Sequence, residues 1–294
     1  MQTTELMTAL KAEIEAHYPD WRADDFTVIG QGLEGLVCRV NTAPFGTVAV
    51  KAPWQRWVVD VNDTMDTREH LRQEAAFAAH LRPYGIPAPA AQHLHLNDDG
   101  LDFLASAYVE HDGSAPDVRA MGQLVRAIHD SPCLERRLVA EECESIHQTL
   151  ALRLSRRARN LERLASIELK QLQAEAIQAA LADYTSHCCI LHMDARPANI
   201  LACEGQIVAI VDWTNALRGD PALELARIAE SGNLSDAFLA GYGGDAFAHL
   251  PRRIETLYRL DTAVMLSLVF LSEAPDAALA ERYVQRVKVL HSQL

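Results

Sequence analysis

The sequence predicts an α+β protein built as two lobes, a small β-rich lobe followed by a larger helical one. Residues 26–50 are rich in β-branched side chains and interrupted by glycines, which is typical of short strands joined by turns. From Gly113 onwards, apolar residues recur mostly at helical spacing. A chain of 294 residues is long enough for two lobes with a large core. We therefore expect an N-lobe over residues 1–105, a hinge over 106–113 and a C-lobe over 114–294.

The elements of the N-lobe can be placed in order along the chain. Residues 3–17 have the spacing of an amphipathic helix, and three short antiparallel strands are expected within 26–50. Residues 66–82 are again helical, until the three prolines of PYGIPAPA end the pattern. Two more strands are expected near 91–96 and 101–109.

The C-lobe is expected to be helical with one β exception. The exception is a hairpin formed by two mostly apolar runs, Asn199–Cys203 and Gln206–Val211, because Gly205 supplies the positive φ of a tight turn. The expected helical segments are about 116–130, 144–163, 168–186, 221–231, 234–241, 250–271 and 276–293.

Composition and charge exclude several classes of protein. No apolar run approaches the roughly 20 residues of a membrane span, and the acidic N-terminus does not have the pattern of a signal peptide. A net charge of −13 argues against binding nucleic acid. The six cysteines form no CxxC pair, and Cys188-Cys189 lies in an apolar run. We expect inert thiols in a buried strand and a cytoplasmic protein.

The predicted hairpin lies in a stretch that carries three oxygen-bearing side chains. This stretch, HMDARPANILACEGQIVAIVDW at 192–213, contains Asp194, Asn199 and Asp212. Folding about the turn would place Ile210 roughly opposite Asn199, so that Asn199 and Asp212 lie at the same end of the hairpin with Asp194 just upstream. Three converging oxygen ligands suit a hard cation such as Mg²⁺.

A glycine-rich motif precedes this stretch. It reads GQGLEGLV and contains Gly30, Gly32 and Gly35. A dinucleotide-binding fold would need a helix after the glycines, but LVCRV predicts a strand. A Walker A loop would end in GK[ST], which is absent from this motif. The strand–glycine loop–strand pattern matches the GxGxxGxV loop whose backbone amides cover the phosphates of ATP in protein kinases.

A single lysine follows the glycine motif at the end of a predicted strand. Lys51 closes the run VAVK, and in protein kinases the equivalent lysine bonds the α- and β-phosphates. A surface lysine on an edge strand is the simpler interpretation. Glu74 on the next helix is the preferred ion-pair partner because it lies near the apolar face, and Glu69 is the alternative.

Together these pieces resemble the aminoglycoside phosphotransferase and choline kinase family, relatives of the protein kinases. The family's loop reads roughly H-G-D-x-x-x-x-N and is followed by a hairpin ending in I-D-W or V-D-W. Here the matching segments are HMDARPAN at 192–199 and VDW at 211–213, with GDPALELA at 219–226 downstream. The resemblance spans roughly residues 26–230 and implies a protein-kinase-like bilobal fold.

The resemblance also implies roles for individual residues. Asp194 would be the base, or the orienting carboxylate, for an acceptor hydroxyl. Asn199 and Asp212 would hold Mg²⁺ against the phosphates of ATP, or of GTP. The adenine would lie against residues 106–110, with Ser106 and Tyr108 among its contacts.

Two residues depart from the family pattern. Met193 replaces the usual glycine, which mildly crowds the loop. Arg196 stands where many of these small-molecule kinases have histidine, and we hypothesise that it contacts the transferring γ-phosphate. A surface salt bridge is the alternative for Arg196. His192 is expected to pack inward, and Asp220 to cap a helix that begins with proline.

The acceptor site is the least determined part of the sequence. The five arginines within 153–163 favour a solvated helix face, with an anionic acceptor as the alternative. Acidic residues that could bind an ammonium group of the acceptor are Glu224, Glu230, Asp236, Asp261 and Glu273.

The resulting prediction is an ATP- and Mg²⁺-dependent phosphotransferase that acts on a small-molecule hydroxyl. The acceptor is expected to be an aminoglycoside or another amine-bearing natural product. The alternatives are a metabolite kinase of the choline or homoserine type, and a nucleotide-binding regulator without transfer activity. The sequence leaves open whether the activity serves antibiotic resistance or metabolism.

Overall fold

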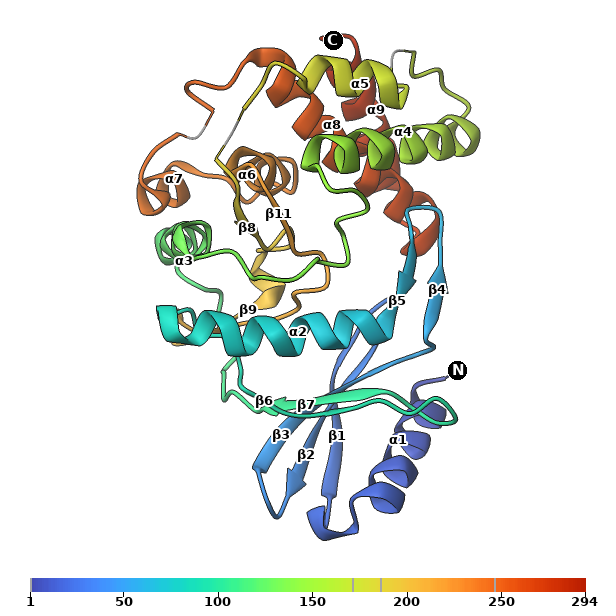
Figure 1. The fold of residues 1–294 in the computed structure, drawn as a ribbon, viewed down its shortest axis with the longest axis vertical. Helices are drawn as coiled ribbons and strands as arrows, with labels where there is room; N and C mark the ends of the chain where they lie inside the picture. Colours follow the sequence, from blue (N-terminus) through green and yellow to red (C-terminus); the bar gives the residue numbers. More distant parts are fainter. Residues whose placement is uncertain (1, 171, 186, 246) are drawn as a thin grey trace. The chain divides into compact units, whose positions relative to one another are not determined.

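The structure is a computed structural model that describes residues 2–170, 172–185, 187–245 and 247–294 (Figure 1). The chain divides into two compact units. The first, which we call the sheet unit, consists of Met1–Val59, Thr64–Ala115 and Ile200–Thr214. The second, the helical unit, consists of Asp60–Asp63, Pro116–Asn199 and Asn215–Leu294. The expected lobe boundaries at residues 105 and 113 stay a prediction.

The sheet unit is built around a five-stranded antiparallel sheet with the strand order β1-β2-β3-β7-β6. The three antiparallel strands predicted within residues 26–50 are present, as are the two predicted near 91–96 and 101–109. The strands are β1 (Asp24–Gln31), β2 (Gly35–Thr42), β3 (Gly46–Pro53), β6 (Ala91–His95) and β7 (Phe103–Ala107).

Two helices accompany the sheet. Helix α1 (Thr3–His17) has the predicted bounds, and its stripe Leu6, Leu10 and Ile14 is fully buried against the apolar residues of β2 and β3. This spacing of four residues brings the three side chains to one helix face. Helix α2 (Thr67–Leu81) begins at the cap Asp66, whose side chain accepts a hydrogen bond from the Arg68 amide.

The predicted hairpin of the C-lobe is present and belongs to the sheet unit. It consists of β9 (Ile200–Cys203) and β10 (Gln206–Ile210). Glu204 (φ 51°) and Gly205 (φ 78°) both have positive φ, as a two-residue type I′ turn requires. The predicted register was wrong by one residue: a bulge between Ile207 and Ala209 pairs Ile210 with Ile200 instead of Asn199.

Of four further short strands, only the one at the vicinal cysteines was predicted. The hairpin of β4 (Trp57–Val59) and β5 (Thr64–Asp66) precedes α2. In the helical unit, β8 (Cys189–Leu191) pairs with β11 (Leu217–Gly219). Strands of three residues carry too little periodicity to be recognised from sequence.

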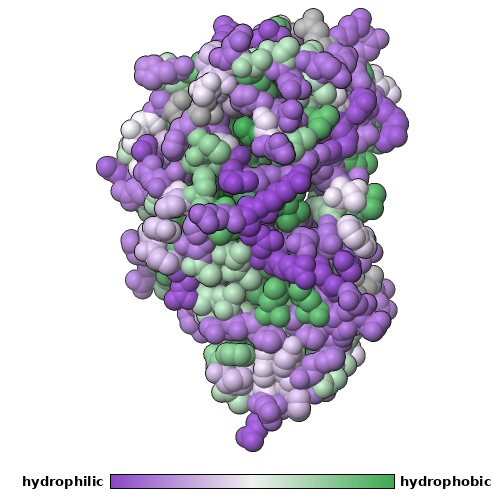
Figure 2. Space-filling view, in the orientation of Figure 1, coloured by the Kyte–Doolittle hydropathy of each residue, from purple (hydrophilic) through white to green (hydrophobic). Residues whose placement is uncertain are grey.

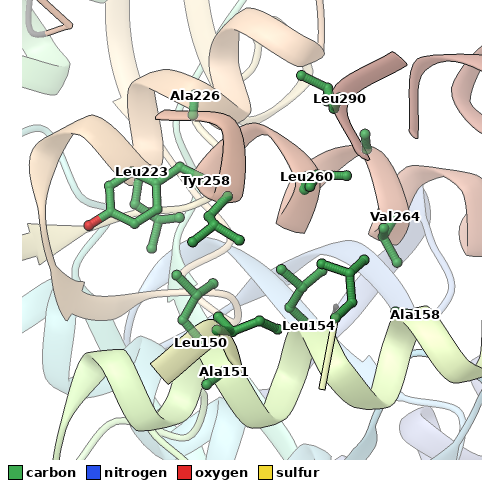
Figure 3. Packing of buried hydrophobic residues seen from close by; sticks show 14 of the residues in the cluster. Leu150, Ala151, Leu154, Ala158, Leu223, Ala226, Tyr258, Leu260, Val264 and Leu290 are labelled. Atoms are coloured by element: carbon green, nitrogen blue, oxygen red, sulfur yellow. The ribbon is translucent and has the colours of Figure 1, made fainter. Parts of the chain in front are cut away.

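Helices form the rest of the helical unit, around a core to which α4, α6 and α8 all contribute. Figure 3 shows Leu150 of α4 close to Leu223 of α6 and Tyr258 of α8. The last helical turn of α8 continues as a π-helix, Val269–Glu273. The α-helices are α3 (Val118–Asp130), α4 (Ile146–Ala165), α5 (Ala174–Leu181), α6 (Pro221–Glu230), α7 (Asp236–Tyr242), α8 (Arg252–Leu268) and α9 (Ala277–His291).

Two predictions about this unit were wrong in part. The helix expected over 168–186 is limited to α5, and residues 171 and 186 lie outside the described chain. The Leu169 amide donates to Glu162 Oε1, and the Leu169 side chain is buried, so this part of the segment is fixed as a turn before the helix begins. Of the two vicinal cysteines, Cys189 is buried in β8 as expected, but Cys188 is exposed.

The visible face of the molecule is mostly hydrophilic (Figure 2), in keeping with 40 acidic and 27 basic residues. Within the described residues, none of the helices is sufficiently long and apolar to cross a membrane.

Candidate active site

The centre of the sheet unit's candidate site is Lys51, on the third strand of the sheet. Adjacent strands fix its position, because Lys51 pairs in register with Val37 of β2 and Leu104 of β7. Its Nζ lies 2.8 Å from Glu74 Oε2 on α2 and 3.0 Å from Asp212 Oδ1, just after β10. Segments far apart in the sequence therefore meet at one ammonium group.

The electrostatics of this cluster keep the lysine charged. Burial of Lys51 opposes its charge, but the carboxylates of Glu74, Asp212 and Glu34 outweigh that effect and raise its pKa above the ordinary value. The alternative partner, Glu69, instead contacts Arg72 one turn along α2. The ion pair expected with Glu74 is thus formed, whereas the part that both residues play toward a nucleotide stays a prediction.

Trp213 anchors the segment that carries Asp212. Its ring is buried and stacks on Phe77 of α2, with ring centroids 4.8 Å apart, and its carbonyl oxygen accepts a hydrogen bond from Gln73. The tryptophan thereby ties the end of the hairpin to the helix that carries Glu74. Asp212 itself has φ 68°, a conformation that is costly for a residue with a side chain and must be held by such contacts.

The glycine loop connects β1 to β2 within the same unit. The Gly32 amide donates to the Gly35 carbonyl, which closes the turn. A Cβ at Gly35 would lie 2.2 Å from the backbone oxygen of Ala52, so the sheet itself excludes any side chain there. A Cβ at Gly32 would meet no atom within 4 Å. The fold therefore requires Gly35 but not Gly32, and Gly30 also has ordinary space.

The expected adenine contacts lie at the end of β7. Ser106 pairs with Ala49 in the sheet, and the Tyr108 amide donates to the Thr47 carbonyl at 3.2 Å. The Arg39 guanidinium lies over the Tyr108 ring, 5.5 Å from its centroid. These contacts fix the backbone at the end of β7, while contact of Ser106 and Tyr108 with the adenine of a nucleotide stays a prediction.

In the helical unit, the predicted catalytic loop follows β8. Asp194 Oδ2 accepts hydrogen bonds from Asn199 Nδ2 at 2.7 Å and from Arg196 Nε at 3.2 Å. Asn199 Nδ2 also donates to the Asp194 carbonyl at 3.0 Å. Asp194 and Asn199 are therefore neighbours, as their spacing predicted, and Arg196 is an exposed residue that bonds Asp194.

A buried glutamate holds this loop in place. Glu224 of α6 accepts from the backbone amides of His192 and Met193, at 2.9 and 2.7 Å, and pairs with His129 of α3 at 2.9 Å. Burial opposes its charge, but these hydrogen bonds and the nearby histidines lower its pKa. The sequence offers Glu224 as a candidate acceptor ligand, but its carboxylate instead braces the predicted catalytic loop.

The other expectations about this loop can be compared with the structure. His192 is fully buried, and its Nδ1 accepts from the Asp194 amide. Met193 adopts φ 61°, which explains why glycine is favoured there, and its buried side chain packs into the core. Asp220 caps α6 by accepting from the Ala222 amide, as predicted, and also accepts from two tyrosine hydroxyls.

Asn199 in the helical unit and Asp212 in the sheet unit each carry side-chain oxygens of the kind that bind magnesium. Both amide protons of Asn199 are used by Asp194, which leaves its Oδ1 without a hydrogen bond to the described part of the chain. Asp212 offers carboxylate oxygens beside Lys51. Amide and carboxylate oxygens are the hard ligands that Mg²⁺ prefers. That Asn199 and Asp212 share one ion stays a prediction.

The remaining acidic candidates do not offer free carboxylates, apart from the exposed Asp236 at the start of α7. Glu230 is paired with Arg259 and Arg286. Glu273 bonds Asn62, and burial raises its pKa.

The arginine-rich segment is only in part the solvated face that the sequence favoured, since Arg159 and Arg163 are exposed. Arg153 and Arg157 are buried, and both bond Asp261; Arg157 also bonds Asp63. The interpretation failed because the acids that neutralise these arginines lie about a hundred residues away in sequence.

Comparison with known proteins identifies the family. The sequence profile of the phosphotransferase enzyme family matches residues 25–255. The chain belongs to this family. As a member, it is a small-molecule phosphotransferase with an alcohol group as acceptor. No curated protein is significantly similar to this phosphotransferase in sequence.

Solved structures similar to the phosphotransferase share its fold at low sequence identity. A GDP complex of a mutant aminoglycoside 2′-phosphotransferase-IIIa is 14% identical with a TM-score of 0.66, covering 98% of each chain. A thermostable mutant of aminoglycoside phosphotransferase APH(4)-Ia, in a ternary complex with AMP-PNP and hygromycin B, is 13% identical with a TM-score of 0.68, covering 97% of this chain and 98% of that one. A choline/ethanolamine kinase family protein from Mesorhizobium loti is 18% identical with a TM-score of 0.62, covering 97% and 94%. The predicted protein-kinase-like α+β fold is confirmed.

Proposed function

We propose that this phosphotransferase moves the γ-phosphate of ATP, with Mg²⁺, to a hydroxyl of a small molecule. The observation that carries the proposal is Lys51, charged and held between Glu74 and Asp212 in the same unit as the glycine loop. Phosphoryl transfer depends on positioning the reactants and on neutralising phosphate charge. A lysine fixed beside two carboxylates would do both for the nucleotide.

The catalytic loop supplies the acceptor half in this proposal. Asp194 orients the acceptor hydroxyl and takes its proton, and Asn199 and Asp212 hold Mg²⁺. When bound, the ion neutralises the phosphate oxygens. Arg196, which already bonds Asp194, would contact the transferring γ-phosphate.

The similar structures support a nucleotide and several acceptor classes. They hold AMP-PNP in one case and GDP in another, so both ATP and GTP are donors to test. An aminoglycoside or another amine-bearing natural product is the first acceptor class, since one neighbour holds hygromycin B. A choline- or homoserine-type metabolite is the second. A regulator without transfer activity is disfavoured because the positions of the catalytic base and both metal ligands are filled.

The test is a broad acceptor assay with wild type and Asp194→Asn. Wild type with ATP and Mg²⁺ should release ADP in step with phosphorylation of at least one acceptor, among aminoglycosides, other antibiotics and amino alcohols. Asp194→Asn should lose about 10²–10⁴ in turnover, because a positioned base contributes that much, while thermal stabilisation by AMP-PNP is kept.

Two results would count against the proposal. Wild type that binds ATP but phosphorylates nothing in the panel would favour a nucleotide-binding regulator without transfer activity. Full activity in Asp194→Asn would show that Asp194 is not the base. Arg196→Ala in the same assay tests the contact of Arg196 with the γ-phosphate. Unchanged turnover in this variant would contradict that contact.

A further inference from the structure

A small pocket lies directly beside Asp194 in the helical unit. It is lined by the catalytic-loop residues 193–196, by one face of α6 and by the turn that follows that helix. Asp194 and Arg196 line it from the loop, and Glu224 and Arg227, one helical turn apart, line it from α6. Any group that enters this pocket is therefore a neighbour of the carboxylate assigned to the acceptor hydroxyl.

Arg227 is half-buried and differs from three other buried or half-buried arginines of this unit. Arg153 bonds Asp261, Arg218 bonds Glu141 and Arg286 bonds Glu230. The Arg227 side chain forms no hydrogen bond and no ion pair with any residue that the structure describes, and only its backbone carbonyl accepts a bond, from the Ser231 amide. Burial lowers its pKa, and the charges of Asp194 and Asp261 partly oppose this. Since a guanidinium stays protonated in proteins, Arg227 is a cation without a bonded partner.

The carboxylates around Arg227 are already engaged. Asp194 bonds Asn199 and Arg196, and Asp261 bonds Arg153 and Arg157. Glu224 bonds His129 and two backbone amides of the catalytic loop. An anion that entered this pocket would meet the open donors of Arg227. Asp194 accepts both of its bonds at Oδ2, which leaves Oδ1 facing no such donor and available to the acceptor hydroxyl.

We infer that the acceptor of this phosphotransferase carries an anionic oxygen group, a carboxylate or a phosphate, which Arg227 binds beside the reacting hydroxyl. The inference rests on the proposed function and narrows its acceptor class. A guanidinium matches a carboxylate or phosphate with two parallel hydrogen bonds, and this pairing would compensate the half-buried charge of Arg227. An amine elsewhere on the acceptor is compatible with it; an acceptor whose only charged groups are ammonium groups is not.

The experiment uses acceptors in pairs that differ only in this charge. Hydroxy amino acids are compared with their carboxamides, and phosphate-bearing alcohols with the parent diols, so that the two arms separate a carboxylate from a phosphate. In wild type the anionic member of one pair should have a KM at least about tenfold lower. Arg227→Gln should raise that KM by about tenfold or more and leave the KM for ATP unchanged. Arg227→Lys, which keeps the charge, should recover part of the difference.

Arg159→Gln, an exposed arginine of α4, serves as the matched control and should behave as wild type. Equal KM values within each pair, or no change in Arg227→Gln, would overturn the inference. It also fails if Arg227→Gln acts on the KM for ATP, because the arginine would then serve the nucleotide.

A measurement of acceptor binding tests this inference independently of the proposed function. If no acceptor is phosphorylated, the proposed function fails, and thermal stabilisation by the same pairs in the presence of AMP-PNP still decides the inference. Stabilisation by the anionic members that is lost in Arg227→Gln would support it, and equal stabilisation within the pairs would overturn it. Circular dichroism of both Arg227 variants shows whether each is folded before it is assayed.

Discussion

The sheet unit and the helical unit both contain a cation held by carboxylates, but at different depths. The side chains of Lys51, Glu74 and Asp212 in the sheet unit are 21%, 17% and 36% exposed. In the helical unit, Arg153 and Asp261 are 6% and 1% exposed. The first group can be reached by a ligand, whereas the second is sealed inside the core.

This difference teaches what each set of charges is for. A partly exposed cluster can exchange one of its bonds for a bond to a ligand, because water and the remaining partner still compensate each charge. A buried pair cannot, because removing one member leaves the other uncompensated in a medium of low polarity. Charges of the sheet unit should therefore matter mainly for activity, and those buried in the helical unit mainly for stability.

The largest stability effect should come from the buried network. Asp261→Asn leaves Arg153 and Arg157 without their shared carboxylate and should lower the free energy of unfolding by about 3–5 kcal/mol. Urea unfolding followed by circular dichroism measures this. Asp236→Asn, an exposed acid in the first turn of α7, is the control and should cost less than about 0.5 kcal/mol. Similar stability of the two variants would contradict the comparison.

A smaller stability effect with a clear loss of activity is expected in the sheet unit. Glu74→Gln removes one of the carboxylates that hold Lys51, so kcat/KM should fall about tenfold to a hundredfold, while the free energy of unfolding changes by less than about 1 kcal/mol. Steady-state kinetics and urea unfolding of one preparation give both numbers. Glu69→Gln, on the same helix, should leave kcat/KM unchanged. A large loss of stability in Glu74→Gln would erase the contrast between the units.

The smallest expected effect concerns Glu13, a less exposed carboxylate of the sheet unit. Glu13 on α1 bonds His95 of β6 and also Asn97. Burial raises its pKa, but these hydrogen bonds and the charges of His17 and His95 prevail and leave it below the ordinary value of 4.5. A carboxylate with a lowered pKa contributes stability above its unfolded pKa, and this contribution is lost as the pH falls through the folded value.

At pH 7, Glu13→Gln should therefore be less stable than wild type by about 1 kcal/mol. The gap should close as the pH falls below 4.5, as followed by thermal unfolding across the pH range. A gap that stays constant with pH would show that the charge of Glu13 contributes nothing.

Much of the candidate site could be predicted from the sequence, because its signals are local. The helix at residues 3–17, the turn at Glu204-Gly205 and the pairing of Asp194 with Asn199 all depend on residues a few positions apart. The strand that carries Lys51 was predictable for the same reason. The register of the hairpin was not, since the bulge near Val208 depends on how β10 meets its surroundings.

The family signature named the candidate site residues, and the tertiary structure decided what surrounds them. Sequence alone determined the longer strands and helices, the predicted catalytic loop and membership of a small-molecule kinase family, because hydrophobic period and motif spacing are properties of the chain itself. Only the fold showed that Glu224 braces the loop, that Arg153 and Arg157 are buried on Asp261, and that Arg227 has no such partner. Pairing between charges distant in sequence depends on packing in three dimensions, and no local pattern records it.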